Sequence, residues 1–582
     1  MISIDKRWLQ VLLGPEVISR STRTASRAVL IVVHNVTALT RLLDVLPAFA
    51  GDTRVRLLFT VIDGSPFGPG AADFLDDIGA RAIPWESAVA SRFDLAVAAG
   101  RSGGLHRLSA PLVVFPHGAG YNKYRKQETG NRKQETGNRK QVYGFAYDQL
   151  VHDGRVVPTA IVLSHAEQLD RLGRACPQAL PAAVVAGDPC YDRMQASRHR
   201  RREYRGALGV RPDQKLIVLT STWGPGSLLE RALELPARLV ADLPMDEYRV
   251  VAAIHPNVWA HHGALEVRRW LAEASQAGLL LLPPREGWRA ALIAADLVVG
   301  DHGSVGVYGA ALDRPVLLAA GEPTELDPAG STARLLRLAP ALEPAYPLRR
   351  QIDEAIGGHV PGRYAELAAG TFALPGESLT TLRSLLYGVM RLPEPPGPAR
   401  VASVDPPEPE GRAPTAMLVS TQVRAQAAGG DVIVEIARFP AAADRPWPAE
   451  PPGADVHLAV DVADSDLGLL ESADVLLRCR QAVGFPAREW TASALADYPG
   501  CRIAADVTTA GRCVLRLRGG PAIEVHQDDG PSGREDPVAM EVLASVIYAW
   551  VVGGRPLAAL ARGVDVRLGV RHTRVRATAP PW

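Results

Sequence analysis

The stretch that decides the fold lies near the start of the chain, at residues 28–63, and reads AVLIVVHNVTALTRLLDVLPAFAGDTRVRLLFTVID. It consists of an apolar run, a segment of helical length and a second apolar run. Continuous Val, Ile and Leu runs are typical of strands buried on both faces, and a helix-length connection between two of them is typical of a parallel sheet. The stretch therefore predicts a β-α-β unit and an α/β fold.

Similar units continue on both sides of a charged run near Arg200. We therefore predict two Rossmann-like domains, at 1–200 and 201–390, which face each other across a cleft. The Pro-rich segment 391–415 predicts a stiff linker. Residues 416–582 predict a smaller α/β or α+β domain, whose role the sequence does not indicate.

Composition narrows the class of protein. The chain has 582 residues, 22% charged and 47% hydrophobic, which is typical of several folded domains. A net charge of +1 gives no reason to expect nucleic acid as a partner. The five cysteines form no CxxC pair, and neither a secretory signal nor a long apolar run is visible. We therefore expect a cytoplasmic protein; its oligomeric state stays open.

Two histidines are candidates for chemistry because each follows an apolar run. His117 precedes Gly118 and Gly120, and glycines let a substrate approach the main chain closely. A near-neutral imidazole is a suitable general base for a hydroxyl. His255 precedes Pro256 and could donate to a phosphate oxygen or a leaving group. At both positions the alternative is a histidine with a local structural role.

The third candidate is the turn Asp301-His302-Gly303-Ser304, which lies between an apolar run and a helix of small residues. Ser304 and the first amides of that helix predict an anion site, because unpaired N–H groups and the helix dipole favour negative charge. An ordinary N-cap is the alternative. We identify no Asp-x-Asp arrangement at a strand end, so no metal is required. Asp192 and Asp301 are better suited to orienting loops near the cleft.

Taken together, the motifs resemble those of the CDP-glycerol glycerophosphotransferase family, the teichoic acid polymerases, which have a GT-B fold. The family's His-Gly and His-Pro motifs are similar to His117-Gly118 and His255-Pro256. The remaining likenesses are a Gly-x-Pro-x-x-Asp turn (Gly187, Pro189, Asp192), a Pro-Thr-Trp-Arg stretch (221–224) and an Asp-Tyr-Ser-Ser-Val turn (301–305) with Arg314-Pro315 downstream. The resemblance covers roughly residues 28–320.

The resemblance implies a GT-B transferase in which His117 is the base and His255 contacts the donor phosphate. It also implies donor-phosphate contacts from Ser304 and the adjacent amides. The predicted substrate-binding residues are Gly118, Asp192, Thr222, Asp301, Gly303 and Ser304. The implied partners are a nucleotide-activated donor and a hydroxyl acceptor, for which a polymer or a lipid-linked molecule at the inner face of the membrane stays open. No cofactor is implied.

The chain departs from the family's pattern at three places. Residues 119–122 replace Thr-Pro-x-Lys, with Lys123 one position late; Gly224 replaces an Arg; and His302-Gly303 replaces Tyr-Ser. A missing Arg removes a forked phosphate clamp that glycine cannot imitate. The donor therefore stays open between CDP-glycerol and a nucleotide sugar. A nucleotide-sugar 2-epimerase and a non-catalytic GT-B scaffold are the alternatives.

The segment 125–141 contains RKQETGN twice and the start of a third copy. The unit has no apolar residue and is too short for a solenoid. Expansion of a tolerant surface loop is the favoured interpretation, since doubling a loop costs only about 0.6 kcal/mol. Guidance of an anionic acceptor or contact with a membrane is the second interpretation. Nucleic acid is disfavoured because glutamates dilute the charge.

Overall fold

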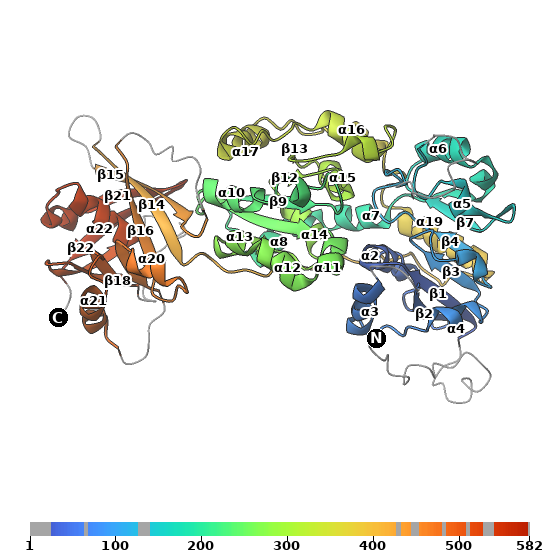
Figure 1. Ribbon diagram of the computed structural model, residues 1–582, viewed down its shortest axis with the longest axis horizontal. Helices are drawn as coiled ribbons and strands as arrows, with labels where there is room; N and C mark the ends of the chain where they lie inside the picture. Colours follow the sequence, from blue (N-terminus) through green and yellow to red (C-terminus); the bar gives the residue numbers. More distant parts are fainter. Residues whose placement is uncertain are drawn as a thin grey trace.

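The computed structural model describes residues 25–62, 68–125, 140–425, 432–443, 453–479, 485–507, 512–527 and 541–579. Three bodies follow one another along the long axis: the first α/β domain, the second α/β domain and a barrel (Figure 1). Most of the repeat, from 126 to 139, lies outside the described residues. In the described part of the chain, no helix combines the length and hydrophobicity needed to cross a bilayer.

The first domain is a six-stranded parallel sheet in the order β2-β1-β3-β4-β7-β8. Helices cover both faces, with α2, α3 and α19 on one and α4 and α6 on the other. The predicted β-α-β unit is confirmed as β1, α2 and β2. The elements are β1 (Arg27–Val33), α2 (Val36–Leu43), β2 (Val55–Val61), α3 (Gly68–Asp77), α4 (Trp85–Val89), β3 (Leu95–Ala98), β4 (Leu112–Val114), α5 (Tyr147–Leu150), β5 (Val151–His152), β6 (Arg155–Val156), β7 (Ala160–Leu163), α6 (Glu167–Ala175) and β8 (Ala183–Val185).

The second domain is a five-stranded parallel sheet in the order β11-β10-β9-β12-β13. Its two faces are again covered by helices, which makes it doubly wound. The elements are α8 (Arg201–Ala207), β9 (Lys215–Ser221), α9 (Leu228–Arg231), α10 (Leu235–Asp242), β10 (Tyr248–Ile254), α11 (Pro256–His262), α12 (Ala264–Trp270), α13 (Ala272–Gln276), β11 (Leu280–Leu281), α14 (Trp288–Ala294), β12 (Leu297–Gly300), α15 (Ser304–Ala311), β13 (Val316–Leu318), α16 (Ser331–Leu338), α17 (Leu348–Gly357) and α18 (Ala365–Ala369).

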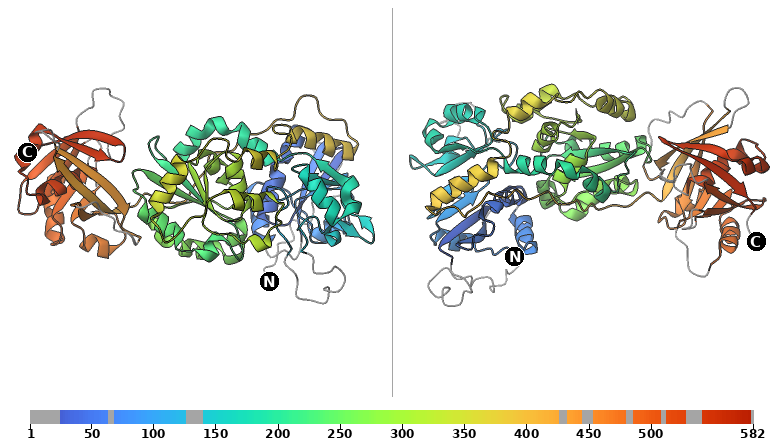
Figure 2. Two further views of the ribbon diagram at one scale, coloured as in Figure 1. Left: turned by 90° about the horizontal axis from the view of Figure 1, so that it is seen from above. Right: turned by 180° about the vertical axis from the view of Figure 1, so that it is seen from behind.

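Two helices connect these domains. Helix α7 (Pro189–Ala196) carries the chain from the first sheet to the second. Helix α19 (Ser378–Met390) falls in the range predicted for the second domain, but it crosses back and packs on the first sheet (Figures 1 and 2). Its Leu382 and Leu386 are fully buried in the same core as β1. The apolar face of α19 is buried because it packs against the core of the first domain.

The predicted linker 391–415 lies along the second domain. Val404 is fully buried in the core of that domain, and its carbonyl accepts a hydrogen bond from the Tyr204 hydroxyl at 2.6 Å. Farther on, the backbone of Glu410 pairs with Leu281 beside β11. The segment is therefore packed against the protein over part of its length and is not a free spacer.

The third domain is a closed barrel of nine strands, a closure that the sequence did not predict. Helix α22 packs against the inward side chains of the strands, while α20 and α21 cover part of the outer surface. The side chains of α22 from Val542 to Trp550 are buried in this core, whereas Val551 and Val552 are exposed. The elements are β14 (Ala416–Ala425), β15 (Val432–Pro440), β16 (Asp455–Asp461), α20 (Leu467–Glu471), β17 (Val475–Arg478), α21 (Ala487–Asp497), β18 (Ile503–Val507), β19 (Arg512–Leu517), β20 (Ala522–Gln527), α22 (Val542–Val552), β21 (Val564–Leu568) and β22 (Arg571–Thr578).

The barrel docks on the turn between α10 and β10 of the second domain. Met245 of this turn packs against the barrel core, and its N–H donates to the Arg438 carbonyl at 2.9 Å. The buried carboxylate of Asp246 accepts hydrogen bonds from Arg438 at 2.7 and 2.8 Å and from Arg571 at 2.9 Å. A buried carboxylate held by two guanidinium groups fixes the orientation of the barrel on the domain.

Candidate functional site

Four loops that follow parallel strands bring the candidate residues to the domain junction. Strand β4 leads to His117, β9 to Thr222, β10 to His255 and β12 to Asp301. Carboxyl ends of parallel strands are where open α/β sheets bind ligands. The two domains approach each other closely here. A Cβ atom added at Gly118 of the first domain would lie only 3.0 Å from Ser304 Oγ of the second domain. Backbone of the first domain therefore meets the start of α15 directly.

His117 is exposed to solvent at this junction, and its ring meets Tyr143 edge-on, with centroids 5.5 Å apart. Loss of hydration by the surrounding protein, together with the charges of Arg101, Arg41 and Lys123, lowers the pKa of His117 to about 4. The ring is therefore neutral at pH 7. A neutral imidazole that reaches solvent is free to accept a proton from a hydroxyl.

His255 caps the N-terminus of α11. Its Nδ1 accepts a hydrogen bond from the Asn257 N–H at 3.1 Å. The proton of the neutral ring must then reside on Nε2, which can donate to a ligand. Burial and the charge of Lys123 lower the pKa of His255 to about 3, so the ring is neutral at pH 7. The tautomer fits the expected role as a donor to a phosphate oxygen.

Asp301 holds two loops of the second domain together. Its Oδ2 accepts from the N–H groups of Thr222 and Leu228 at 2.8 Å each, and its Oδ1 accepts from the Gly303 N–H at 2.9 Å. The carboxylate is buried, and burial raises its pKa. Asp301, which was predicted to orient a loop and to belong with Thr222 to the substrate-binding set, is engaged by three amides. Thr222 packs against Gly303.

The start of α15 keeps its amides available. Gly303 is the N-cap residue, and it supplies no side-chain hydrogen bond. Ser304 is the first residue of the helix rather than its cap. Uncapped N–H groups and the positive end of the helix dipole attract an anion. The ordinary N-cap that was the alternative to an anion site is therefore not what this turn forms.

Lys123 is the functional candidate that sequence reasoning missed. Its Nζ lies 3.4 Å from Nε2 of His302, which places a first-domain cation against the turn 301–304 of the second domain. Its charge acts in the same direction on His117, His255 and His302, and with burial it lowers the pKa of His302 to about 4. A lysine soon after the His-Gly pair was the available signal, but its offset from the family's position concealed it.

A short ladder holds the segment after His117 to the second domain. The Tyr124 N–H donates to the Glu325 carbonyl at 2.8 Å, and the Asp327 N–H donates to the Asn122 carbonyl at 2.8 Å. The Asn122 side chain accepts from the Ser331 hydroxyl at 3.0 Å. Tyr124 also pairs with Val142, so backbone pairing holds together the residues that flank the segment 126–139.

Asp192 lies outside this constellation. Its carboxylate is buried and accepts from the N–H groups of Gly376 at 2.8 Å and Ser378 at 2.9 Å, which caps the start of α19. Asp192 was expected in the substrate site. Its structural task is instead to hold the helix that crosses back to the first domain.

A buried ion pair forms a second contact between the domains. Arg289 of α14 donates to Asp44 Oδ2 at 2.6 Å, and both side chains are 1% exposed. Arg193 of α7 donates to the other oxygen of Asp44 at 3.2 Å. One carboxylate of the first domain is thus shared by the second domain and the connecting helix.

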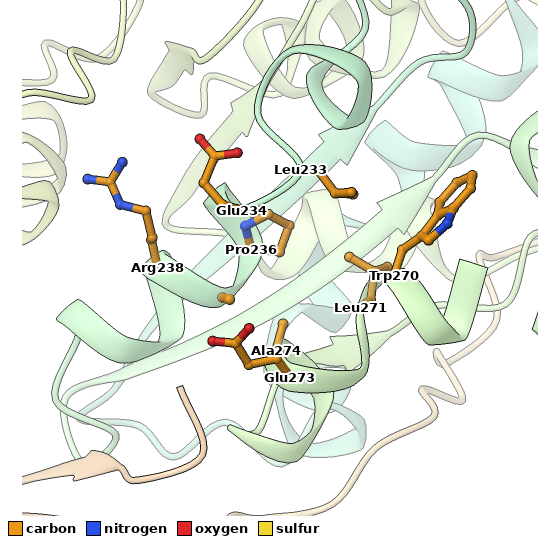
Figure 3. Close-up of a pocket in the computed structure, with 9 residues that line it drawn as sticks. Leu233, Glu234, Pro236, Arg238, Trp270, Leu271, Glu273 and Ala274 are labelled. Atoms are coloured by element: carbon orange, nitrogen blue, oxygen red, sulfur yellow. The ribbon is translucent and has the colours of Figure 1, made fainter. Parts of the chain in front are cut away.

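The pocket in Figure 3 lies away from the junction, and the described residues include no candidate metal-binding cluster. Within the described ranges, no group of three or more His, Cys, Asp or Glu residues is arranged to hold a metal. The pocket has a volume of about 490 Å³ and is lined by residues within 233–238 and 270–274, on α12, α13 and the start of α10 (Figure 3). None of its lining residues carries the candidate chemistry.

No protein-family model and no curated protein matches the chain. Among solved structures, the wall teichoic acid polymerase TagF is 11% identical with a TM-score of 0.43, over 63% of this chain and 90% of that one. S. aureus MnaA with UDP is 10% identical with a TM-score of 0.38, over 64% and 100%. The UDP-GlcNAc 2-epimerase of Neisseria meningitidis with UDP-GlcNAc is 12% identical with a TM-score of 0.37, over 62% and 100%. At TM-scores below 0.5 these likenesses carry no argument for a reaction.

Proposed function

We propose that the chain is a GT-B-type transferase that moves a glycerophosphate-like or glycosyl group from a nucleotide-activated donor to a hydroxyl acceptor. The observation that carries this proposal is the convergence of Lys123, His255, His302 and the uncapped start of α15 beside His117. An ammonium group, the Nε2–H of His255 and helix amides are together suited to a diphosphate. The cytoplasmic location and a peripheral membrane contact belong to the same proposal.

In the proposed reaction His117 is the base. The acceptor hydroxyl loses its proton to the neutral ring of His117 while its oxygen bonds to the transferred group. The bond between that group and the nucleotide's phosphate oxygen breaks, and the electron pair stays on the nucleotide. Lys123, His255 Nε2–H and the α15 amides stabilise the charge that develops there. The donor's negative charge also offsets Lys123, which raises the pKa of His117 and strengthens the base.

The first test is a thermal-shift titration of the full chain with CDP, UDP, GDP and ADP, since a ligand that binds the folded state raises the melting temperature. We expect selective stabilisation by one nucleotide. CDP would direct the search to polyol-phosphate donors, and UDP would direct it to nucleotide sugars. No stabilisation by any of them at millimolar concentration would refute the proposal and favour a non-catalytic scaffold.

The second test is turnover by a His117→Ala variant. A missing base should abolish transfer while the donor's Kd changes little. His106→Ala is the matched control, because His106 is an exposed first-domain histidine whose ring stacks on His152 at 3.7 Å. Full activity of His117→Ala would contradict the assignment. Conversion of a UDP-sugar without any acceptor would identify an epimerase instead.

A further inference from the structure

Trp223 lies on the loop that follows β9 and keeps a large part of its ring in solvent. It is 38% exposed, and it is the single tryptophan among the exposed large hydrophobic residues of the described ranges. A single exposed apolar side chain is ordinary at a protein surface. What distinguishes Trp223 is its place beside the candidate site, where a flat ring can contact a ligand.

The loop that carries Trp223 is held rigidly from both ends. Asp301 binds the N–H groups of Thr222 before the ring and Leu228 after it, at 2.8 Å each. Between them Gly224 and Gly226 take positive φ angles of 84° and 74°, which side chains other than glycine rarely adopt. The ring therefore stands on a preformed backbone rather than on a segment that has to order on binding.

The same loop packs against the proposed phosphate site. A Cβ added at Gly303 would lie 3.2 Å from Thr222 Cβ, and one added at Gly226 would lie 3.5 Å from the His302 ring. The ring centroids of Trp223 and His255 are 6.4 Å apart, with an interplanar angle of 37°. Tilted rings at this distance are neighbours in contact. A phosphate held by His255 would thus lie beside the Trp223 ring, within reach of the nucleoside of the same donor.

We propose that Trp223 is the stacking platform for the nucleobase of the donor. This inference rests on the proposed function, since it names the part of the donor that this side of the site recognises. Every base presents a flat π-face, and stacking on an aromatic side chain contributes affinity without reading the base edge. Trp223 then contributes affinity for any nucleoside, while other contacts determine which nucleoside is preferred.

The test separates the base from the phosphates. Binding of CDP, UDP and inorganic pyrophosphate is measured by calorimetry for the wild-type full chain and for Trp223→Leu, Trp223→Phe and His255→Ala. We expect Trp223→Leu to weaken the better nucleotide by about 5- to 150-fold, the range of one base–aromatic stack, and to leave pyrophosphate within about twofold. Trp223→Phe should keep most of the affinity, and His255→Ala should weaken both probes.

Fluorescence gives an independent readout. The wild-type emission minus that of Trp223→Phe isolates this tryptophan, and its quenching by nucleotide but not by pyrophosphate is the expected signature. Tyr346→Leu is the control, because it removes an exposed ring that is 63% accessible from another loop of the same domain. Its nucleotide affinity should match the wild type.

Each remaining outcome overturns the inference in a distinguishable way. An unchanged nucleotide Kd in Trp223→Leu removes the stacking role and leaves the proposed function standing. Equal weakening of nucleotide and pyrophosphate assigns Trp223 to holding the loop. A wild-type protein that binds pyrophosphate but no nucleotide, or neither probe, refutes the donor site itself along with the platform.

Discussion

An Asp301→Asn variant tests whether this carboxylate organises the second-domain side of the junction. In the wild type Oδ2 receives two amide hydrogen bonds, from Thr222 and Leu228, and Oδ1 receives one, from Gly303. Asparagine has one acceptor oxygen. The amide should place that oxygen where Oδ2 was, which keeps two bonds and turns its NH2 group toward the Gly303 N–H.

The cost follows from counting these bonds. Loss of the charged bond to Gly303 costs about 1.5–3 kcal/mol, and the other two bonds lose their charge assistance at about 1 kcal/mol each. The sum is roughly 3–5 kcal/mol of local stability. Asp301→Ala removes all three acceptors and should cost more than the asparagine variant.

Hydrogen–deuterium exchange of the amides measures this loss where it occurs. Protection at Thr222, Leu228 and Gly303 should fall by roughly two to three and a half orders of magnitude in Asp301→Asn, at about 1.4 kcal/mol per tenfold. Asp192→Asn is the matched control, because its carboxylate also binds backbone amides, those of Gly376 and Ser378. Wild-type protection in Asp301→Asn, or equal loss in the control, would refute the reasoning.

Three further predictions concern charge, docking and the repeat. Lys123→Met removes a charge that lowers the pKa of three histidines, so the acid limb of the kcat/KM profile should move to higher pH; a limb that stays or moves down contradicts this. Asp246→Asn leaves Arg438 with Glu541, at 3.1 Å, as its remaining carboxylate and should cost about 1.5–3 kcal/mol in urea denaturation, whereas wild-type stability would show that the ion pair does not secure the barrel. Deletion of 132–138 should preserve the melting temperature and nucleotide affinity, because loop length costs little; a large drop in either excludes simple loop expansion.

The parallel sheets could be predicted because their signal is local. Strand β1 and its helix are adjacent in sequence, and burial on both faces leaves an unbroken apolar run at Val29 to Val33. The placement of His117 and His255 at strand ends follows from the same runs. Each apolar run ends near the residue where the chain leaves the sheet. The end of a strand can therefore be predicted from its own sequence, without knowing which strands pair with it.

The barrel could not be predicted because its closure depends on distant pairings. Strand β15 pairs in parallel with β21, with Val434 opposite Val566, and no short-range pattern specifies that partner. Helix α19 presents the same difficulty, since an apolar face indicates burial but not the core that receives it. Lys123 was obscured for a different reason: it lies one residue beyond the position of the lysine in the motif that the sequence resembles, so the comparison of motifs passed it over.

The chain crosses between the α/β domains three times, through α7, into α19 and back along residues 391–404, and these crossings restrict how the domains can move. Bodies joined by several peptide connections cannot slide freely past one another, but they can still rotate by a small angle at the junction. The barrel is fixed to the far side of the second domain through Asp246, so it would turn with that domain as a lever arm. A few degrees at the junction would then displace the barrel by a much larger distance, and the overall length of the molecule in small-angle scattering would report the state of the site.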